Sequence, residues 1–180
     1  MPDILFEFWR TLYFVISPYA ANAFPPLVKG KHPIDFGKNF FDGHRILGDG
    51  KTWEGLFGGL AFGTFCGTIA WLFYDELNSI ALTNNFSLPY ISPFSAFILS
   101  LGALLGDLLG SFIKRRFGMQ RGAPAPFLDQ LDFLAGAFLL GSFVTEISLG
   151  IVIWAVPMTL IIHRISNIIG YLLKLKKEPW

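Results

Sequence analysis

Apolar stretches long enough to cross a lipid bilayer occupy most of this 180-residue chain. A membrane-spanning helix needs about 20 mostly apolar residues. Hydrophobic residues make up 53% of the sequence and charged residues only 15%, whereas soluble domains carry about 25% charged residues. The sequence therefore predicts an all-α, polytopic membrane protein, a single integral membrane domain over residues 1–180 with five transmembrane helices, at 4–23, 53–74, 91–113, 127–144 and 149–173.

The basic residues indicate which side of the membrane each loop faces, because cytoplasmic loops are enriched in Lys and Arg. With five spans, the loops 24–52 and 114–126 and the C-terminus share one side. Nearly all basic residues fall there, namely Lys29, Lys31, Lys38, Arg45, Lys51, Lys114, Arg115, Arg116, Arg121, Arg164, Lys174, Lys176 and Lys177. The other side has only Arg10 and is otherwise acidic. We therefore expect a multi-pass protein of the cell membrane with its N-terminus outside and its C-terminus in the cytoplasm.

Glycine recurs at every fourth position in two of the predicted spans. The positions are Gly55, Gly59, Gly63 and Gly67 in the second span and Gly102, Gly106 and Gly110 in the third. Small residues at this spacing let two helices approach closely. We expect these faces to pack the second and third helices against each other or across a homodimer.

Charged and polar residues gather at the cytoplasmic ends of the third and fourth spans. They are Asp107, Ser111, Lys114, Arg115, Asp129 and Asp132. Ser111 lies four residues and Lys114 seven residues after Asp107, so these three share one helical face, and the arginine lies beside it. The last two are three residues apart and share a face of the next helix. Since a charge at the centre of a membrane costs about 2.5–3.5 kcal/mol, this convergence calls for an explanation.

The carboxylates favour a magnesium site. Carboxylates without softer ligands nearby suit Mg²⁺, which keeps several waters and takes other ligands from substrate phosphates. Ser111, Lys114 and Arg115 would supply hydroxyl and cationic contacts to those phosphates. Metal and phosphate together indicate a nucleotide or a phospholipid. The alternative is that the basic run 114–116 anchors its helix at the membrane surface, while the aspartates pair with it in a structural network.

A second polar region, DGHRILGDGKTWEG at 42–55, leads into the second span. GDGKT is similar to part of a phosphate-binding P-loop, but Arg45 replaces the required glycine and no strand precedes it. Lys51 and Thr52 at a helix N-terminus can still bind an anion through backbone N–H groups. Alternatively, Thr52 only caps a helix that begins at Trp53.

Three sequence blocks resemble the membrane cytidylyltransferases that make CDP-activated lipids. They are KTWEG at 51–55, GD-x-x-x-S-x-x-K-R at 106–115, and D-x-x-D at 129–132. The bacterial and eukaryotic CDP-diacylglycerol synthases carry a Lys-Asp pair and a Pro-Gly-His-Gly-Gly run before the aspartates, where this chain has RGAPAPFLDQLD. This compact pattern is similar to the archaeal branch, the CDP-archaeol synthases.

The resemblance implies a reaction and a set of site residues. An isoprenoid ether-lipid phosphate, digeranylgeranylglyceryl phosphate, would attack the α-phosphorus of CTP and release pyrophosphate. The implied catalytic residues are Asp107, Lys114, Asp129 and Asp132. The implied Mg²⁺ ligands are Asp107, Asp129 and Asp132, and the implied nucleotide and phosphate contacts are Lys51, Thr52, Ser111, Lys114, Arg115 and Arg121.

Other functions remain open from the sequence. A CDP-diacylglycerol synthase would use phosphatidic acid instead. A small ion or solute transporter would place charges at mid-depth on several helices, whereas here they gather at one rim; Glu7, Arg10 and His163 are left unexplained by the rim. Phosphatidyl transferases also use clustered aspartates, but their D-G-x-x-A-R run is absent from this sequence. We expect the bilayer and CTP as partners, and no nucleic acid.

Overall fold

The computed structural model describes residues 4–172, and the regular structure of that part is helical. Its helices are α1 (Ile4–Phe14), α2 (Ile16–Ala23), α3 (Pro25–Val28), α4 (Trp53–Leu72), α5 (Tyr74–Thr83), α6 (Pro93–Arg116), α7 (Leu128–Gly141) and α8 (Leu149–Leu172). The loop between α3 and α4 adds two isolated β-bridges. The all-α prediction is confirmed for these residues, whereas Lys174, Lys176 and Lys177 lie outside the described part.

Three helices of the described part are long and apolar enough to cross a membrane, over Trp53–Leu72, Pro93–Arg116 and Leu149–Ile169. They match the second, third and fifth predicted spans. The fourth span contains α7, which has 14 residues and is therefore only about 21 Å long. The first is kinked at Val15 between α1 and α2. Pro18 explains the kink, because a proline ring clashes with the carbonyl four residues earlier.

The stretch 75–90, expected as a polar loop, begins with a helix instead. α5 follows α4 after a single residue, Phe73. Asp75 and Glu76 lie in its first turn, where carboxylates stabilise the positive end of the helix dipole. The side-chain oxygen of Asn78 accepts a hydrogen bond from the Leu88 N–H at 2.9 Å. The two acidic residues are therefore a helix-start signal within the stretch that was expected to be a loop.

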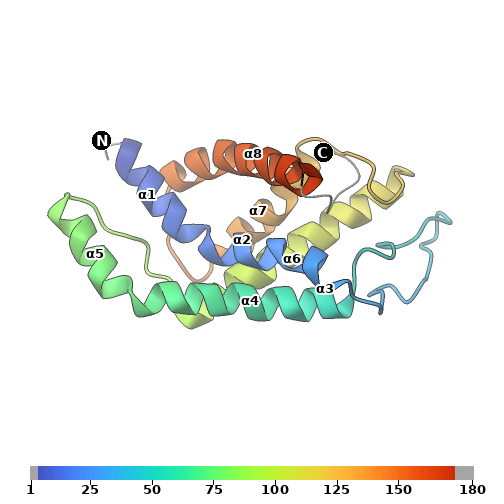
Figure 1. Cartoon of the computed structure of the whole chain (residues 1–180), viewed down its shortest axis with the longest axis horizontal. Coiled ribbons are helices and arrows are strands. Elements are labelled where there is room, and N and C mark those ends of the chain that lie inside the picture. Colours follow the sequence, from blue (N-terminus) through green and yellow to red (C-terminus); the bar gives the residue numbers. More distant parts are fainter. Residues whose placement is uncertain (1–3, 173–180) are drawn as a thin grey trace.

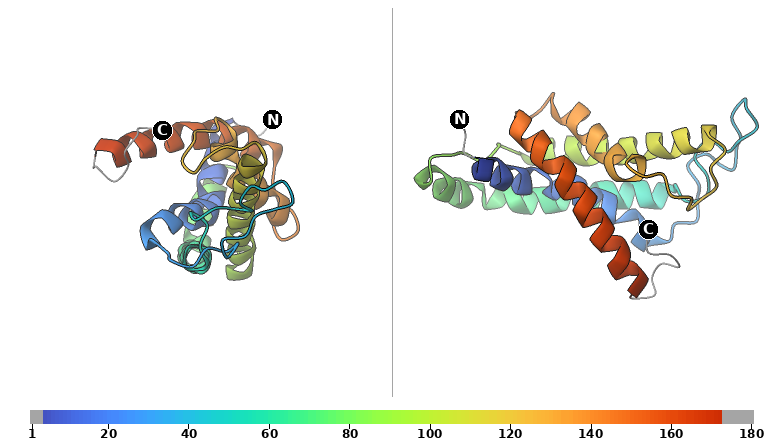
Figure 2. Two further views of the ribbon diagram at one scale, coloured as in Figure 1. Left: turned by 90° about the vertical axis from the view of Figure 1, so that its right-hand side faces the viewer. Right: turned by 90° about the horizontal axis from the view of Figure 1, so that it is seen from above.

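The helices run between two ends of the molecule (Figure 1). One end, on the right of Figure 1, holds the start of α4, the end of α6 and the loop 29–52. The opposite end holds the start of α1 and all of α5. α8 crosses the other helices obliquely, and its C-terminal half projects away from them in both views of Figure 2.

The two glycine faces pack helices closely, but they have different partners. The glycines of α4 face α2 and small residues of α6: a methyl group on Gly63 would lie 2.6 Å from Cβ of Ala21 and 2.5 Å from Oγ of Ser100. The glycines of α6 face α7 instead, and a methyl group on Gly106 would meet the backbone of Asp132. The predicted contact between the second and third spans is therefore present, but the third span uses its own glycines for the fourth.

Gly106→Ala is expected to lower the free energy of unfolding by about 1–3 kcal/mol, the usual cost of overpacking. The added methyl group would meet the α7 backbone, which cannot turn aside as a flexible side chain can. Reversible unfolding in mixed micelles measures the change. Leu105→Ala, at a side chain that is 45% exposed, is the control and should change stability little. Equal stability of Gly106→Ala and the original chain would show that α7 can move away from α6.

Candidate active site

An ion pair joins the start of α4 to the middle of α6. The Thr52 hydroxyl accepts a hydrogen bond from the Gly55 N–H at 3.2 Å, so Thr52 is the N-cap of α4. Lys51 immediately precedes this cap, and its Nζ lies 2.5 Å from Oδ2 of Asp107. The capping role of Thr52, one of two sequence-based alternatives, is thus confirmed. The charged group that reaches α6 from this segment is the Lys51 ammonium group.

A second ion pair joins the end of α6 to the start of α7. The ammonium group of Lys114 contacts Oδ1 of Asp129. The other oxygen, Oδ2, accepts a hydrogen bond from the Ala125 N–H at 2.8 Å. Phe127, with a positive φ of 65°, is the N-cap residue at the turn from which α7 starts. Asp129 therefore binds a lysine and also fixes the connection between the two helices.

Asp132 lies between these two ion pairs. Its carboxylate packs against Gly110, where a larger residue would collide with it, and Oδ1 accepts a hydrogen bond from the Phe133 N–H at 2.6 Å. Its charged neighbours are Lys51 and Asp107 of the first ion pair and Lys114 of the second. We call the five residues Lys51, Asp107, Lys114, Asp129 and Asp132 the charged rim. The fold thus brings Asp107 and Asp132 together with two lysines, and Asp129 pairs with one of those lysines.

The other predicted contacts lie around the charged rim. Nη1 of Arg115 donates a hydrogen bond to the Met119 carbonyl at 2.5 Å, and its buried Nε has no partner among the described residues. The Arg115 side chain approaches Gly48, and that of Arg121 approaches Gly50. Ser111 is almost fully buried in α6. Both arginines therefore face the Gly-rich segment before Lys51, whereas Ser111 offers little surface to a ligand.

A small pocket of about 20 Å³ opens beside the first ion pair. Lys51 and Asp107 line it together with Gly50 and apolar residues of α3, α4 and α6. A larger groove of about 470 Å³ lies along the outer face of α4 and reaches Phe97 of α6. Its lining carries no charged side chain, so the charged chemistry belongs to the pocket at the rim.

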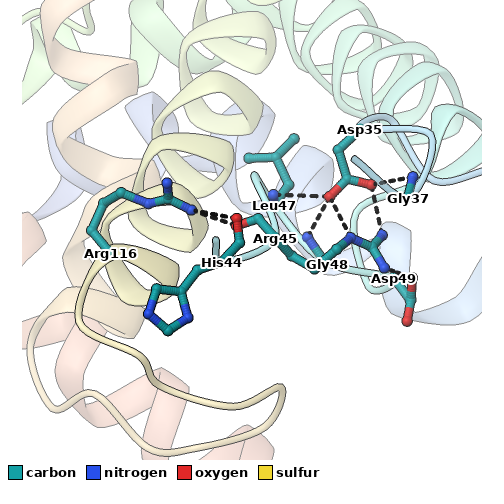
Figure 3. A network of polar contacts seen from close by, with 8 residues as sticks. All are labelled: Asp35, Gly37, His44, Arg45, Leu47, Gly48, Asp49 and Arg116. Atoms are coloured by element: carbon teal, nitrogen blue, oxygen red, sulfur yellow. Dashed lines mark hydrogen bonds and ion pairs between the residues drawn. The ribbon is translucent and has the colours of Figure 1, made fainter. Parts of the chain in front are cut away.

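A buried carboxylate organises the loop 29–52, and the sequence pattern did not single it out. Asp35 Oδ2 accepts hydrogen bonds from the Leu47 N–H at 3.0 Å and the Gly48 N–H at 2.8 Å. Oδ1 accepts from the Gly37 N–H at 3.1 Å and from Nη2 of Arg45 at 2.7 Å. Figure 3 shows these contacts converging on one side chain. Asp-x-Gly is a known turn signal, but it does not reveal the more distant partners.

The charge of Asp35 is strongly stabilised. Burial alone would raise the pKa of this carboxyl, but the hydrogen bonds from Arg45 and from three backbone N–H groups outweigh burial and hold the pKa well below its usual range. The guanidinium pKa of Arg45 is raised in turn, chiefly by its hydrogen bond with Asp35. The pair is therefore fully ionised at neutral pH.

Arg116 fixes the same loop to α6. Its guanidinium donates to Oδ1 of Asp42 at 2.9 Å and to the Arg45 carbonyl at 2.5 Å, as Figure 3 shows for Arg45. It also lies 4.7 Å from the ring centroids of both Phe40 and Phe112, a favourable cation–π geometry. Arg116, which the sequence suggested only as a membrane-surface anchor, therefore clamps the loop.

The carboxylates of the charged rim suit magnesium by their chemistry. Mg²⁺ is commonly held by one or two carboxylates and completes its shell with water and substrate phosphates. Asp107 and Asp132 are mutual neighbours and offer such a pair. Within residues 4–172 no three Asp, Glu, His or Cys side chains lie close enough together to hold a metal ion, so the set of three carboxylates stays a prediction.

Comparisons with known proteins show the family of this chain. The family model described as "CarS-like: CDP-archaeol synthase" matches residues 1–180. A CDP-archaeol synthase from Pyrobaculum aerophilum is 49% identical over 175 residues, which cover 94% of this chain and 98% of the relative. One from Pyrococcus abyssi is 43% identical over 181 residues and covers both chains completely.

A solved structure is similar as well. It is described as "Structural insight into an intramembrane enzyme for archaeal membrane lipids biosynthesis" and superposes with a TM-score of 0.74 at 37% identity. The match covers 87% of this chain and 92% of that one, so the fold and the membrane setting are shared. A family match over the full length and relatives at more than 40% identity establish that the chain belongs to the CarS-like family of CDP-archaeol synthases.

Proposed function

We propose that this chain transfers a cytidylyl group from CTP to an isoprenoid ether-lipid phosphate and so forms CDP-archaeol and pyrophosphate. The full-length match to the CDP-archaeol synthases carries the proposal. The charged rim supports it independently, because its lysine–carboxylate pairs gather at one end of apolar helices. Such a place suits a reaction between a water-soluble nucleotide and a lipid.

The chemistry requires two anions to meet. A phosphate oxygen of the lipid attacks the α-phosphorus of CTP, a new P–O bond forms, and the bond to pyrophosphate breaks. A phosphomonoester with a second pKa of about 6 is mostly dianionic at neutral pH, so no general base is needed. Positioning and neutralisation of charge dominate catalysis of this kind.

The two lysines would neutralise the substrates. Without substrate, Lys51 and Lys114 are held by Asp107 and Asp129. When the phosphates bind, each ammonium group exchanges a carboxylate for a phosphate oxygen, at little electrostatic cost. Arg115 and Arg121, which approach the segment 48–50, would contact the phosphates of CTP. Thr52 would act through its helix cap.

Asp107 and Asp132 would hold Mg²⁺, with Asp129 as the third carboxylate of the set. The ion would neutralise phosphate charge and help to orient the triphosphate. When Lys51 turns to a phosphate, the Asp107 carboxylate loses its lysine partner and becomes free to bind the ion. This exchange couples the two binding events within the charged rim.

The path of the chain suits five passes through the membrane. α1 to α3 run toward the charged rim, α4 away from it, α6 toward it, α7 away and α8 toward it (Figure 1). The charged rim lies in the cytoplasm, because the basic loops 24–52 and 114–126 lie there and CTP is cytoplasmic. The N-terminus is then outside. The glycine faces are covered within one chain, so they do not require the homodimer that remains a prediction.

One assay tests the proposal. Detergent-purified protein is incubated with CTP, Mg²⁺ and either digeranylgeranylglyceryl phosphate or phosphatidic acid, and CDP-lipid and pyrophosphate are measured. We expect both products from the ether lipid. Product from phosphatidic acid alone would assign the bacterial type of substrate, and no product from either lipid would refute the proposed activity. Omission of Mg²⁺ should abolish turnover, and undiminished turnover after chelation would refute the metal.

A further inference from the structure

Lys51 is held in place by backbone contacts on both sides. Its N–H donates a hydrogen bond to the Gly48 carbonyl at 3.2 Å, and its carbonyl accepts one from the Ile34 N–H at 2.9 Å. Gly48 and Ile34 are far apart in sequence, but both adjoin the Asp35 side chain: one donates to it and the other precedes it. The position of the rim lysine therefore depends on how the chain is folded around Asp35.

The Asp35 carboxylate is the centre of that fold. Its side chain is completely buried, and five hydrogen bonds reach it, from Gly37, Leu47, Gly48 and both Nε and Nη2 of Arg45. These residues belong to no helix or sheet, although isolated β-bridges pair Asn39 with Arg45 and Pro33 with Thr52. The charged carboxylate adds side-chain contacts that join the two arms of the loop (Figure 3).

The same network reaches the helix that carries Asp107. The Arg45 carbonyl accepts a hydrogen bond from Nη2 of Arg116, near the end of α6. Arg45 thus contacts Asp35 through its guanidinium and α6 through its backbone. The loop is fixed internally by Asp35 and externally by Arg116, and Lys51 is thereby held opposite Asp107.

We propose that Asp35 is a positioning residue for CTP: it holds the segment Gly48 to Lys51 so that the Lys51 ammonium group meets the nucleotide phosphates. This inference rests on the proposed function, and it adds a residue that touches neither substrate. The ionised state of Asp35 at neutral pH agrees with the role, because only a carboxylate can accept all five hydrogen bonds.

Asp35→Asn tests the role with almost no change in side-chain shape. The amide nitrogen of asparagine is a donor, so at one of the two former oxygen positions the N–H groups that now meet the carboxylate lose their acceptor. Asp49→Asn is the matched control. Asp49 pairs with the same guanidinium, through Nη1 at 2.7 Å, but its side chain is 63% exposed.

We expect Asp35→Asn to raise the KM for CTP by at least about tenfold, equivalent to about 1.4 kcal/mol, and to leave the KM for the lipid phosphate unchanged. Asp49→Asn should leave both constants unchanged. A purely structural defect would lower the fraction of active protein and change neither KM. Amide hydrogen exchange at Leu47 and Gly48 should become faster in Asp35→Asn and not in Asp49→Asn.

The outcomes separate this role from the activity itself. If the unsubstituted protein makes no CDP-lipid, the proposed function is refuted. If the unsubstituted protein is active and folded Asp35→Asn has an unchanged KM for CTP, only the role of Asp35 is refuted. Equal increases in the KM for CTP and the KM for the lipid phosphate would refute that role as well. If Asp35→Asn does not fold, Arg45→Lys keeps the positive charge but loses the two-point contact, and it should raise the KM for CTP alone; unchanged constants in that variant would refute the role.

Discussion

Asp132→Asn is expected to lower the kcat for CDP-lipid formation by about 10²- to 10³-fold, the usual effect of removing one preorganised electrostatic group from an active site. The carboxylate lies between both ion pairs of the charged rim and packs on Gly110. Asparagine fills the same space but carries no charge, so it would neither balance the two lysines nor bind Mg²⁺ strongly. Turnover at saturating CTP and lipid phosphate measures the loss.

The control for this prediction lies at the end of the molecule opposite the charged rim, and a companion variant lies within the rim. Asp75→Asn, in the first turn of α5, removes a carboxylate far from the charged rim and should leave kcat unchanged. Asp129→Asn is a companion variant and not a control: it should lower kcat as well, because it releases Lys114 and weakens the turn before α7. Oligomer size and expression should be preserved in each variant. Full activity in both Asp129→Asn and Asp132→Asn would contradict the assignment of these residues to the metal.

Local spacing predicted the part of the charged rim that lies on α6 and α7, whereas Lys51 joined the site only through the family resemblance. The interval of seven residues from Asp107 to Lys114 fixes a shared helical face, and the structure uses that face for both ion pairs. Spacing does not identify the partner of a face. Gly106 belongs to a pattern that any small-residue helix could match, and its contact with α7 depends on how the whole chain packs. The helix α5 was missed because the whole polar stretch between the second and third spans was taken as a loop.

The loop 29–52 was the least predictable part of the site. Asp35 contacts Leu47 and Gly48, which are 12 and 13 residues away, across a segment without regular structure. Periodicity carries no information about such contacts, because the loop has neither helical nor strand repeats. The contacts of Arg116 were equally unpredictable. Its position within the basic run 114–116 suggested a surface anchor, whereas its guanidinium binds the loop.

Glu7→Ala is expected to destabilise the folded protein by about 3–5 kcal/mol, the usual cost of breaking a buried ion pair by removal of one partner. Glu7 is buried in α1, and its Oε1 accepts a hydrogen bond from Nη1 of Arg10 at 2.7 Å. Oε2 accepts one from the Ser148 hydroxyl at 2.6 Å, and that hydroxyl accepts from the Ile151 N–H in the first turn of α8 at 3.2 Å. Without Glu7, the Arg10 cation loses its carboxylate and the Ser148 hydroxyl loses its acceptor.

A matched series separates the charge from the helix cap. Ser148→Ala removes one hydrogen bond and should cost about 1 kcal/mol. Glu7→Ala combined with Arg10→Ala should be more stable than Glu7→Ala alone, because no unpaired charge is left. Reversible unfolding in mixed micelles measures all three. CDP-lipid formation at low temperature should persist, since the start of α1 lies at the end opposite the start of α4 and the end of α6 (Figure 1). Stability unchanged in Glu7→Ala with activity lost would instead favour a transport or catalytic role for this buried pair.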